Sequence, residues 1–258
     1  MYDSSKGLIW GRNLKMTKIV HMSDMHIGFT QFREDILLNT INNINKMRPD
    51  AVVISGDITD NGYYREFVKA KGYIDLLIPP TMVIPGNHDA RNIGDEVFEE
   101  VIGHRYSSLE LIDSNIKIIG LDSSVPDLGH GKIGRLQKHF LEHEIMDAKE
   151  RNMFTIITVH HHIISVPNTG RERNVLSDAG DILLLLLQNN INLVLSGHKH
   201  VPHVWKMNDT LFATAGTVSS MKLRGNTHPS YNVIDIDDNQ IKITLVNSDG
   251  STQELTPP

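Results

Sequence analysis

The stretch Pro85-Gly86-Asn87-His88-Asp89 decides the fold that this sequence predicts. It follows the apolar run 81–84, so its polar side chains come directly after a predicted strand. Four more polar clusters follow apolar runs in the same way: Asp24-Met25-His26, Gly56-Asp57, His160-His161-His162 and Gly197-His198-Lys199-His200. We therefore expect five strand ends to direct their polar residues to one place. Asp, Asn and His are oxygen and nitrogen ligands, and no cysteine competes with them, so the pattern predicts a metal centre.

Length and composition indicate a folded α/β chain. Its 258 residues, of which 40% are hydrophobic and 22% are charged, are enough to bury a full core. We expect a single domain over residues 17–258, preceded by an N-terminal extension over residues 1–16. Met16 directly precedes the first predicted strand and is a candidate for the native start.

Charge and composition also exclude several classes of protein. The net charge of -6 argues against a sequence-independent grip on a nucleic-acid backbone, so we expect no stable nucleic-acid binding. Without cysteine there is neither a disulfide framework nor thiol catalysis. No apolar run approaches the ~20 residues that cross a bilayer, and the amino terminus lacks a signal-peptide pattern. We expect a cytoplasmic protein without membrane association; the sequence leaves a homodimer open.

Apolar runs and helical spacing alternate along most of the chain, which predicts repeated βαβ units. The predicted strands are 18–22, 51–55, 81–84, 109–112, 116–121, 154–159 and 193–196. The predicted helices are 32–47, 64–78, 95–102, 135–151 and 181–189. The last part of the chain turns to β structure, and we expect successive antiparallel strands over 201–207, 210–215, 231–236 and 241–246.

Each polar cluster has a plain structural explanation when it is taken alone. Asp24 and His26 can reach one ion from a strand exit, but a single Asp-x-His pair is as often solvated. Asp57 can cap the next segment with Asp60 as its exposed partner, and a lone histidine is more often a satisfied core or surface residue. The segment 87–89 is more specific, because it offers a ligand, a proton donor and an orienting carboxylate.

The combination of the five clusters in this order resembles the calcineurin-like metallophosphoesterase superfamily, over Asp24 to His200. The resemblance implies an α/β fold, a four-layer αββα sandwich with a dinuclear metal site at the loops that leave the central sheets. It implies that Asp57 bridges two metal ions. The implied ligands are Asp24, His26, Asp57 and His200 for one ion, and Asp57, Asn87, His160 and His198 for the other. His88 then matches the non-ligand histidine near the substrate phosphate, and Asp89 its orienting partner.

A narrower resemblance points to one branch of this superfamily. Leu121-Asp122-Ser123, followed by Gly131, Gln137 and Phe140-Leu141, is similar to class III cyclic-nucleotide phosphodiesterases and related glycerophosphodiesterases. Members of that branch commonly have His-His-Pro after this strand, whereas this chain has His162 at the proline position. By that alignment His160 is the ligand, and His161 and His162 are supporting residues.

These resemblances predict a metal-dependent phosphodiesterase that hydrolyses small phosphodiesters, such as a cyclic nucleotide or a glycerophosphodiester. A hydroxide held by two Mn, Fe or Zn ions would attack phosphorus, and His88 would protonate the leaving group. The alternatives are a phosphomonoesterase or protein phosphatase, a nuclease, and a non-enzymatic scaffold. A monoester would favour additional cations, for which Arg91, Lys199, Arg171 and Arg173 are candidates. Lys199 lies between two predicted ligands, where an extended backbone would direct it away from them.

Overall fold

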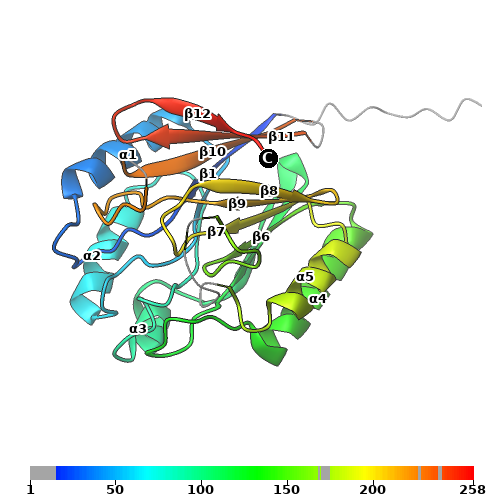
Figure 1. Cartoon of the computed structure of the whole chain (residues 1–258), viewed down its shortest axis with the longest axis horizontal. Helices are drawn as coiled ribbons and strands as arrows, with labels where there is room; N and C mark the ends of the chain where they lie inside the picture. Colours follow the sequence, from blue (N-terminus) through cyan, green and yellow to red (C-terminus); the bar gives the residue numbers. More distant parts are fainter. Residues whose placement is uncertain (1–15, 168, 170–174, 226–227, 238–239) are drawn as a thin grey trace, which may run out of the picture.

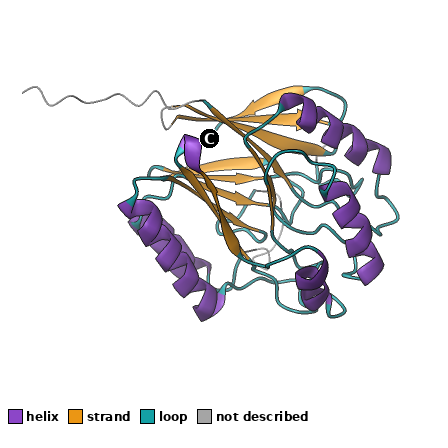
Figure 2. Ribbon diagram, turned by 180° about the vertical axis from the view of Figure 1, so that it is seen from behind, coloured by secondary structure: helices purple, strands orange, loops and turns teal. Residues whose placement is uncertain are grey.

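Two six-stranded sheets lie face to face, and helices cover their outer faces (Figures 1 and 2). The structure is a computed structural model that describes residues 16–167, 169, 175–225, 228–237 and 240–258. This arrangement confirms the predicted four-layer αββα sandwich. Within the described residues, no helix combines the length and the apolar character that crossing a bilayer requires.

The first sheet has the strand order β12-β11-β10-β1-β2-β3. Its strands are β1 (Thr17–Met22), β2 (Ala51–Ile54), β3 (Thr81–Val83), β10 (Ser230–Asp237), β11 (Gln240–Asn247) and β12 (Thr252–Leu255). The strands β1, β2 and β3 are parallel, whereas β10 joins β1 antiparallel. The helices of this half are α1 (Glu34–Met47), α2 (Tyr64–Ile74) and α3 (Gly94–Val101). Parallel pairing brings the carboxyl ends of β1, β2 and β3 to one edge of the molecule.

The second sheet has the order β4-β5-β6-β7-β9-β8. Its strands are β4 (Ser107–Leu111), β5 (Ile116–Leu121), β6 (Phe154–Val159), β7 (Leu193–Ser196), β8 (His203–Met207) and β9 (Thr210–Thr214). A short 3-10 turn, η1 (Ile112–Ser114), joins β4 to β5, and the helices are α4 (Gly134–Glu150) and α5 (Ala179–Gln188). The strands β5, β6, β7 and β9 are parallel.

Strand β1 shows how alternation of side chains builds the layers. Val20 and Met22 are fully buried with residues of α1 and α2, whereas Ile19 is fully buried with residues of the second sheet. Neighbouring side chains of a strand point to opposite faces, so one strand supplies both cores. Full burial of such a side chain stabilises the fold by about 1.5 to 3 kcal/mol.

Helix α1 packs on the first sheet through one apolar stripe. Leu37, Ile41 and Ile44 are buried, at the spacing that places side chains on one helix face. The helix ends at Arg48, which takes a left-handed conformation with φ 52° and donates its backbone N–H to the Ile44 carbonyl oxygen. The chain can then turn directly into β2.

The β-rich end of the chain forms the predicted antiparallel pairs β8 with β9 and β10 with β11, but it is not one succession of antiparallel strands. Strand β9 pairs parallel with β7 in the second sheet, and the chain then crosses to the first sheet, where β10 pairs with β1. Strand β12 was not predicted, because Thr252–Leu255 is polar and largely exposed and carries no apolar alternation. Helix α2 ends at Ile74 instead of the predicted Ile78, and the chain continues in tighter turns, in which the N–H groups of Leu76 and Leu77 donate to the carbonyl oxygens of Tyr73 and Ile74.

Candidate metal centre

Six of the predicted ligands meet in two groups at the end of the sandwich where the parallel strands finish. Each group places three ligand atoms within 4.8 Å of one another. The first group is Asp24, His26 and His200, and the second is Asp57, His160 and His198. These residues follow β1, β2, β6 and β7, so both sheets contribute to the centre.

The nitrogen and oxygen atoms of the first group have the spacing of ligands around one ion. The Nε2 atoms of His26 and His200 lie 3.0 Å apart, and Nε2 of His200 lies 3.1 Å from Oδ1 of Asp24. Two nitrogen ligands on a tetrahedral zinc ion lie about 3.3 Å apart, given metal–nitrogen distances of about 2.0 to 2.1 Å. The Nδ1 atom of His200 donates to the carbonyl oxygen of Lys222 over 2.6 Å, which directs Nε2 inward.

Asp57 links the two groups. Its Oδ2 atom lies 3.3 Å from Nε2 of His160 and 3.9 Å from Nε2 of His26. The Nδ1 atom of His160 donates to the Ser55 carbonyl oxygen over 2.7 Å, which fixes the ring and leaves Nε2 facing Asp57. Asn87 follows Gly86, whose Cα is packed so closely against Asp57 that a Cβ there would overlap the carboxylate.

Several buried ligand atoms have no hydrogen-bond partner within the described part of the chain. They are Oδ1 of Asp24, Oδ1 of Asn87, Nε2 of His160 and both ring nitrogens of His198. Leaving one buried polar atom unsatisfied costs about 1 to 3 kcal/mol, so such a concentration requires a compensating ligand. These atoms are electron-pair donors, and divalent cations fit this donor set.

The backbone is strained at the same residues. Asp24, His26, Asp57, His198 and His200 all have positive φ, between 51° and 75°. Such conformations cost about 1 to 3 kcal/mol each and are usually retained at functional sites. Neighbouring loops hold them in place, because the backbone N–H groups of Asp24 and His26 donate to the carbonyl oxygens of Gly56 and Asp57.

Opposite charges shift the pKa values inside the centre. Burial alone would lower the pKa of His26 and His160, but contacts with Asp24 and Asp60 for the former and with Asp57 for the latter raise each pKa to about 9. Burial would likewise raise the pKa of Asp57, but the charge of His160 holds it well below its usual range. The carboxylates are therefore ionised, as ligands must be.

His88 lies beside the centre and is oriented by Asp60 and Arg91. Its Nδ1 atom donates to the Asp60 carbonyl oxygen over 2.8 Å, and its Nε2 atom accepts from the Arg91 guanidinium over 3.1 Å. The Asp60 carboxylate oxygen Oδ1 also lies 3.3 Å from Nδ1 of His88 and 3.4 Å from Nδ1 of His26. Asp60 thus contacts both a predicted ligand and the predicted proton donor. The sequence predicted no role for Asp60 at the site and suggested it only as an exposed partner in the structural explanation of Asp57, although its position three residues after Asp57 was a usable signal.

The predicted role of Asp89 as the orienting partner of His88 is wrong. The fully buried Asp89 carboxylate instead accepts from the backbone N–H groups of Ile58, Thr59 and Gly86 and from the Thr59 hydroxyl. Burial and the charge of Asp57 raise the pKa of Asp89 to about 6. Asp89 therefore ties the loop after β2 to the loop after β3 and positions Asp57.

Among the three adjacent histidines, only His160 belongs to a ligand group. The Nδ1 atom of His161 pairs with the Ser123 hydroxyl at 2.8 Å, and Nε2 of His162 donates to the Gly197 carbonyl oxygen at 2.8 Å. Burial lowers the pKa of His161 well below its usual range and that of His162 to about 4, so both rings are neutral. This geometry favours the predicted register, with His161 and His162 as supports.

Lys199 does not lie on the extended backbone that its expected direction assumed. His198 and His200, which flank it, both have positive φ. Burial lowers the pKa of Lys199, as do the charges of Arg224 and Lys222, whereas the carboxylates of Asp24 and Asp57 act in the opposite direction. Arg91 is a second cation at the centre, whereas Arg171 and Arg173 lie outside the described residues.

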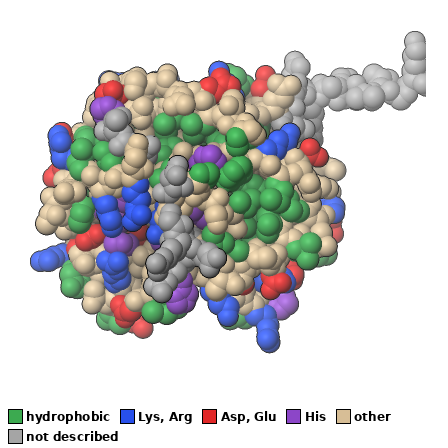
Figure 3. Space-filling view, in the orientation of Figure 1, with side chains coloured by type: hydrophobic (Ala, Val, Ile, Leu, Met, Phe, Trp, Pro, Cys, Tyr) green, Lys and Arg blue, Asp and Glu red, His purple; other side chains and the backbone are tan. Residues whose placement is uncertain are grey.

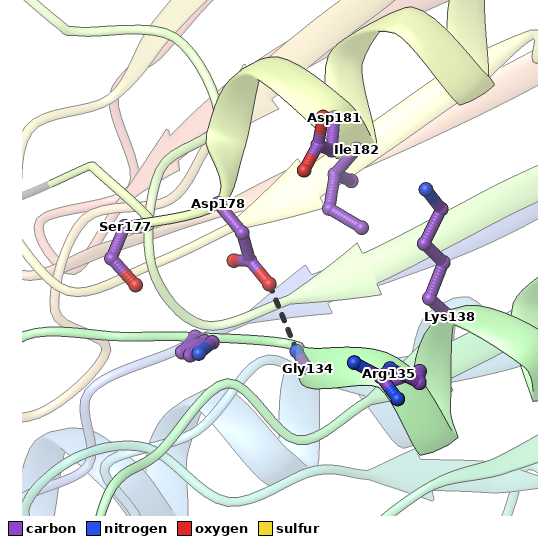
Figure 4. A pocket seen from close by; sticks show the side chains of 8 residues that line it. Gly134, Arg135, Lys138, Ser177, Asp178, Asp181 and Ile182 are labelled. Atoms are coloured by element: carbon purple, nitrogen blue, oxygen red, sulfur yellow. Dashed lines mark hydrogen bonds between the residues drawn. The ribbon is translucent and has the colours of Figure 1, made fainter.

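A separate cavity of about 560 Å³ lies between the first turns of α4 and α5 (Figure 4). Lys132, Arg135, Lys138 and Ser177 are among the residues that line it. Asp178 spans this cavity and accepts from the backbone N–H groups of Ile133 and Gly134 over 3.1 and 2.9 Å. Asp178 therefore caps α4, and none of the predicted ligands lines the cavity.

The sequence matches a family model described as calcineurin-like phosphoesterase over residues 17–202, which is more than half of the chain. The chain belongs to the calcineurin-like phosphoesterase family. It is therefore a phosphoric ester hydrolase of a family with dinuclear metal sites, and the two ligand groups described above are the candidates for that site.

Curated relatives include several phosphodiesterases. A probable glycerophosphodiester phosphodiesterase, GpdQ, from Arcobacter nitrofigilis is 32% identical over 225 residues, which covers 78% of this chain and 78% of that protein. The 3',5'-cyclic adenosine monophosphate phosphodiesterase CpdA from Escherichia coli is 26% identical and covers 71% of this chain and 69% of that protein. A probable cyclic nucleotide phosphodiesterase from Xenorhabdus bovienii is 26% identical and covers 81% of this chain and 88% of that protein.

Solved structures of phosphatases share the fold. A purple acid phosphatase from yellow lupin seeds superposes with a TM-score of 0.74 at 15% identity, over 93% of this chain. This chain spans only 53% of the lupin chain. A dimetal phosphatase from Danio rerio superposes with a TM-score of 0.69 at 12% identity, over 94% of this chain and 99% of that chain. At these identities, the likeness shows the fold alone.

Proposed function

We propose that this protein hydrolyses small phosphodiesters at a centre of two divalent cations that share Asp57. The observation that carries the proposal is the position of the Asp57 carboxylate, whose Oδ2 atom lies 3.3 Å from His160 and 3.9 Å from His26. The names of relatives support the diester class, because they include a glycerophosphodiester and a cyclic-nucleotide phosphodiesterase.

The residues divide into two ligand sets. Asp24, His26 and His200 would hold one cation with Asp57, and Asn87, His160 and His198 would hold the other with Asp57. Bound divalent cations would supply a nucleophile near neutral pH and neutralise charge on the phosphoryl oxygens. This mixed nitrogen and oxygen set suits Mn, Fe or Zn.

His88 is the proposed proton donor to the leaving oxygen. A guanidinium can only donate, so the contact with Arg91 makes Nε2 of neutral His88 an acceptor and puts its proton on Nδ1. We expect the substrate phosphoryl group to draw Arg91 away, because a guanidinium pairs with phosphate oxygens in a bidentate manner. Nε2 could then take up a proton from water and deliver it to the leaving oxygen, while Asp60 holds the ring.

A phosphomonoesterase is the second candidate, because Arg91 and Lys199 both lie at the centre. A monoester carries nearly two negative charges and gains more from added cations. The relatives with diesterase names favour the first candidate. We further propose a cytoplasmic location, in line with the absence of cysteine from the sequence.

The deciding experiment compares two chromogenic substrates after metal loading. The protein is purified, stripped with chelator and reloaded separately with Mn²⁺, Zn²⁺ or Fe²⁺. The proposal predicts a higher kcat/KM for bis(p-nitrophenyl) phosphate than for p-nitrophenyl phosphate. A clear preference for the monoester with every metal would refute the diesterase proposal and favour the phosphomonoesterase.

A further inference from the structure

Three cations border the candidate metal centre on the side of His200. Lys199 lies between the ligands His198 and His200, whereas Lys222 and Arg224 lie on the loop before β10. Figure 3 shows lysine and arginine side chains close to histidine on one face of the molecule. We refer to Lys199, Lys222 and Arg224 as the basic rim.

Direct contacts attach the basic rim to the centre. The Lys222 carbonyl oxygen accepts from Nδ1 of His200 over 2.6 Å, so the loop of Lys222 is fixed to a predicted ligand. The Lys222 ammonium lies 5.8 Å from the centroid of the Phe29 ring, and that ring lies 6.3 Å from the ring of His26. The loop thus places positive charge within reach of a molecule bound at the metals.

Within the described residues, the basic rim has no close ion-pair partner. Many other lysine and arginine side chains do form ion pairs there. Like charges that lie close together repel one another, and an anion bound among them would relieve that repulsion.

We propose that the basic rim binds a second anionic group of the substrate, so that the preferred substrate is a small phosphodiester that carries an additional phosphate. This inference rests on the proposed diesterase function and narrows its substrate class. The diester phosphate has one negative charge, for which the two cations and Arg91 suffice. The basic rim borders the metal centre and is not needed at the reacting phosphorus, so its positive charges are suited to bind a further phosphate on the same molecule.

Two nucleotide esters with one leaving group test the proposal. They are the p-nitrophenyl ester of thymidine 5'-monophosphate and the same ester with an added 3'-phosphate. Both release p-nitrophenolate from a diester and differ only in the second anion. With the Mn²⁺-loaded protein, we expect kcat/KM to be about tenfold higher for the 3'-phosphorylated ester, mainly through a lower KM, because a remote anion binds equally in ground and transition states.

The variant Lys222→Ala/Arg224→Ala should reduce this advantage to about two- to threefold, as should high salt, because solvent-exposed charges are screened. Lys206→Ala is the matched control, since Lys206 is an exposed lysine of β8 at the far end of the second sheet and should leave the advantage intact. Lys199 is left unchanged because its neighbours are predicted ligands.

Four results would overturn the proposal in different ways. Equal kcat/KM for the two esters, or an undiminished advantage in the double variant, would refute the basic rim as an anion site while leaving the diesterase intact. No release of p-nitrophenolate from any diester would refute the proposed function itself. If kcat/KM for a single-stranded thymidine oligonucleotide exceeded that for the 3'-phosphorylated ester, the preferred substrate would be a nucleic acid and not a small diester.

Discussion

Nε2 of His160 lies 3.3 Å from Oδ2 of Asp57, although the two residues follow strands of different sheets. His160 follows β6 of the second sheet, and Asp57 follows β2 of the first. The candidate metal centre therefore exists only when the two sheets are docked. Metal binding should report on the complete fold and not on either half alone.

Asp60→Asn should lower kcat about 10- to 100-fold, which is typical for loss of a residue that orients a metal ligand. The asparagine keeps the size of the side chain but removes the charge that faces His26 and His88. Steady-state kinetics and metal analysis of the reloaded protein measure the effect. Asp209→Asn is a control on an exposed residue of the turn between β8 and β9. Unchanged kcat in Asp60→Asn would mean that this carboxylate orients neither histidine.

His88→Ala should reduce kcat by roughly 10² to 10⁴, because general acid catalysis typically contributes that much. The loss should be largest for esters with poor leaving groups, which need the proton most. Metal content and thermal stability should stay at the level of the unmodified protein. If the variant lost both metals instead, His88 would be a ligand or a structural support.

The register of the three histidines can be tested by a pair of substitutions. His160→Ala should remove the cation of the second group, because its Nε2 atom faces Asp57. His161→Ala should retain that cation, since the ring pairs with Ser123. Metal analysis after gel filtration distinguishes the two variants. The reverse pattern would shift the ligand assignment by one residue.

Metal binding at pH 7 should release protons. The pKa values of His26 and His160 are raised to about 9 in the chain without metal, so both rings are protonated at pH 7, whereas a ligating imidazole is neutral. Apparent metal affinity should therefore rise with pH up to about 9. Calorimetric titrations in buffers of different ionisation enthalpy measure the release, and heats that do not depend on the buffer would contradict it.

The raised pKa values of His26 and His160 also determine how the stability of the metal-free protein depends on pH. A group whose folded pKa exceeds its unfolded pKa stabilises the fold below the unfolded value, and this contribution is lost as pH rises through the folded value. For His26 and His160 that window runs from about 6.5 to about 9. With chelator present, the free energy of unfolding should fall across this range.

The sequence predicted the convergence of the five polar clusters because parallel strands finish at one edge, and buried apolar runs identify such strands well. It did not predict that β10 returns to the first sheet and pairs with β1. The apolar pattern of a strand shows that it is a strand, but the packing of the two sheets determines which strand it pairs with. Strand β12 was missed because its residues are polar and exposed.

The errors at the site have a common physical cause. Positive φ at His198 and His200 breaks the extended backbone on which the expected direction of the Lys199 side chain rested. The tight turn at Asp57 likewise brought Asp60 beside His26 and left Asp89 facing the backbone of the neighbouring loop. The residue types predicted the chemistry of the site. The left-handed backbone at Asp57, His198 and His200, which the sequence did not predict, helps to determine which carboxylate contacts which histidine.

Anomalous diffraction from crystals of the Mn²⁺-loaded protein tests the central claim most directly. We expect two manganese peaks about 3.5 to 4 Å apart, as in two-metal sites, with the Asp57 carboxylate between them. One peak should be bound by Asp24, His26 and His200, and the other by Asn87, His160 and His198. A single peak, or two peaks without Asp57 between them, would contradict the shared-carboxylate centre.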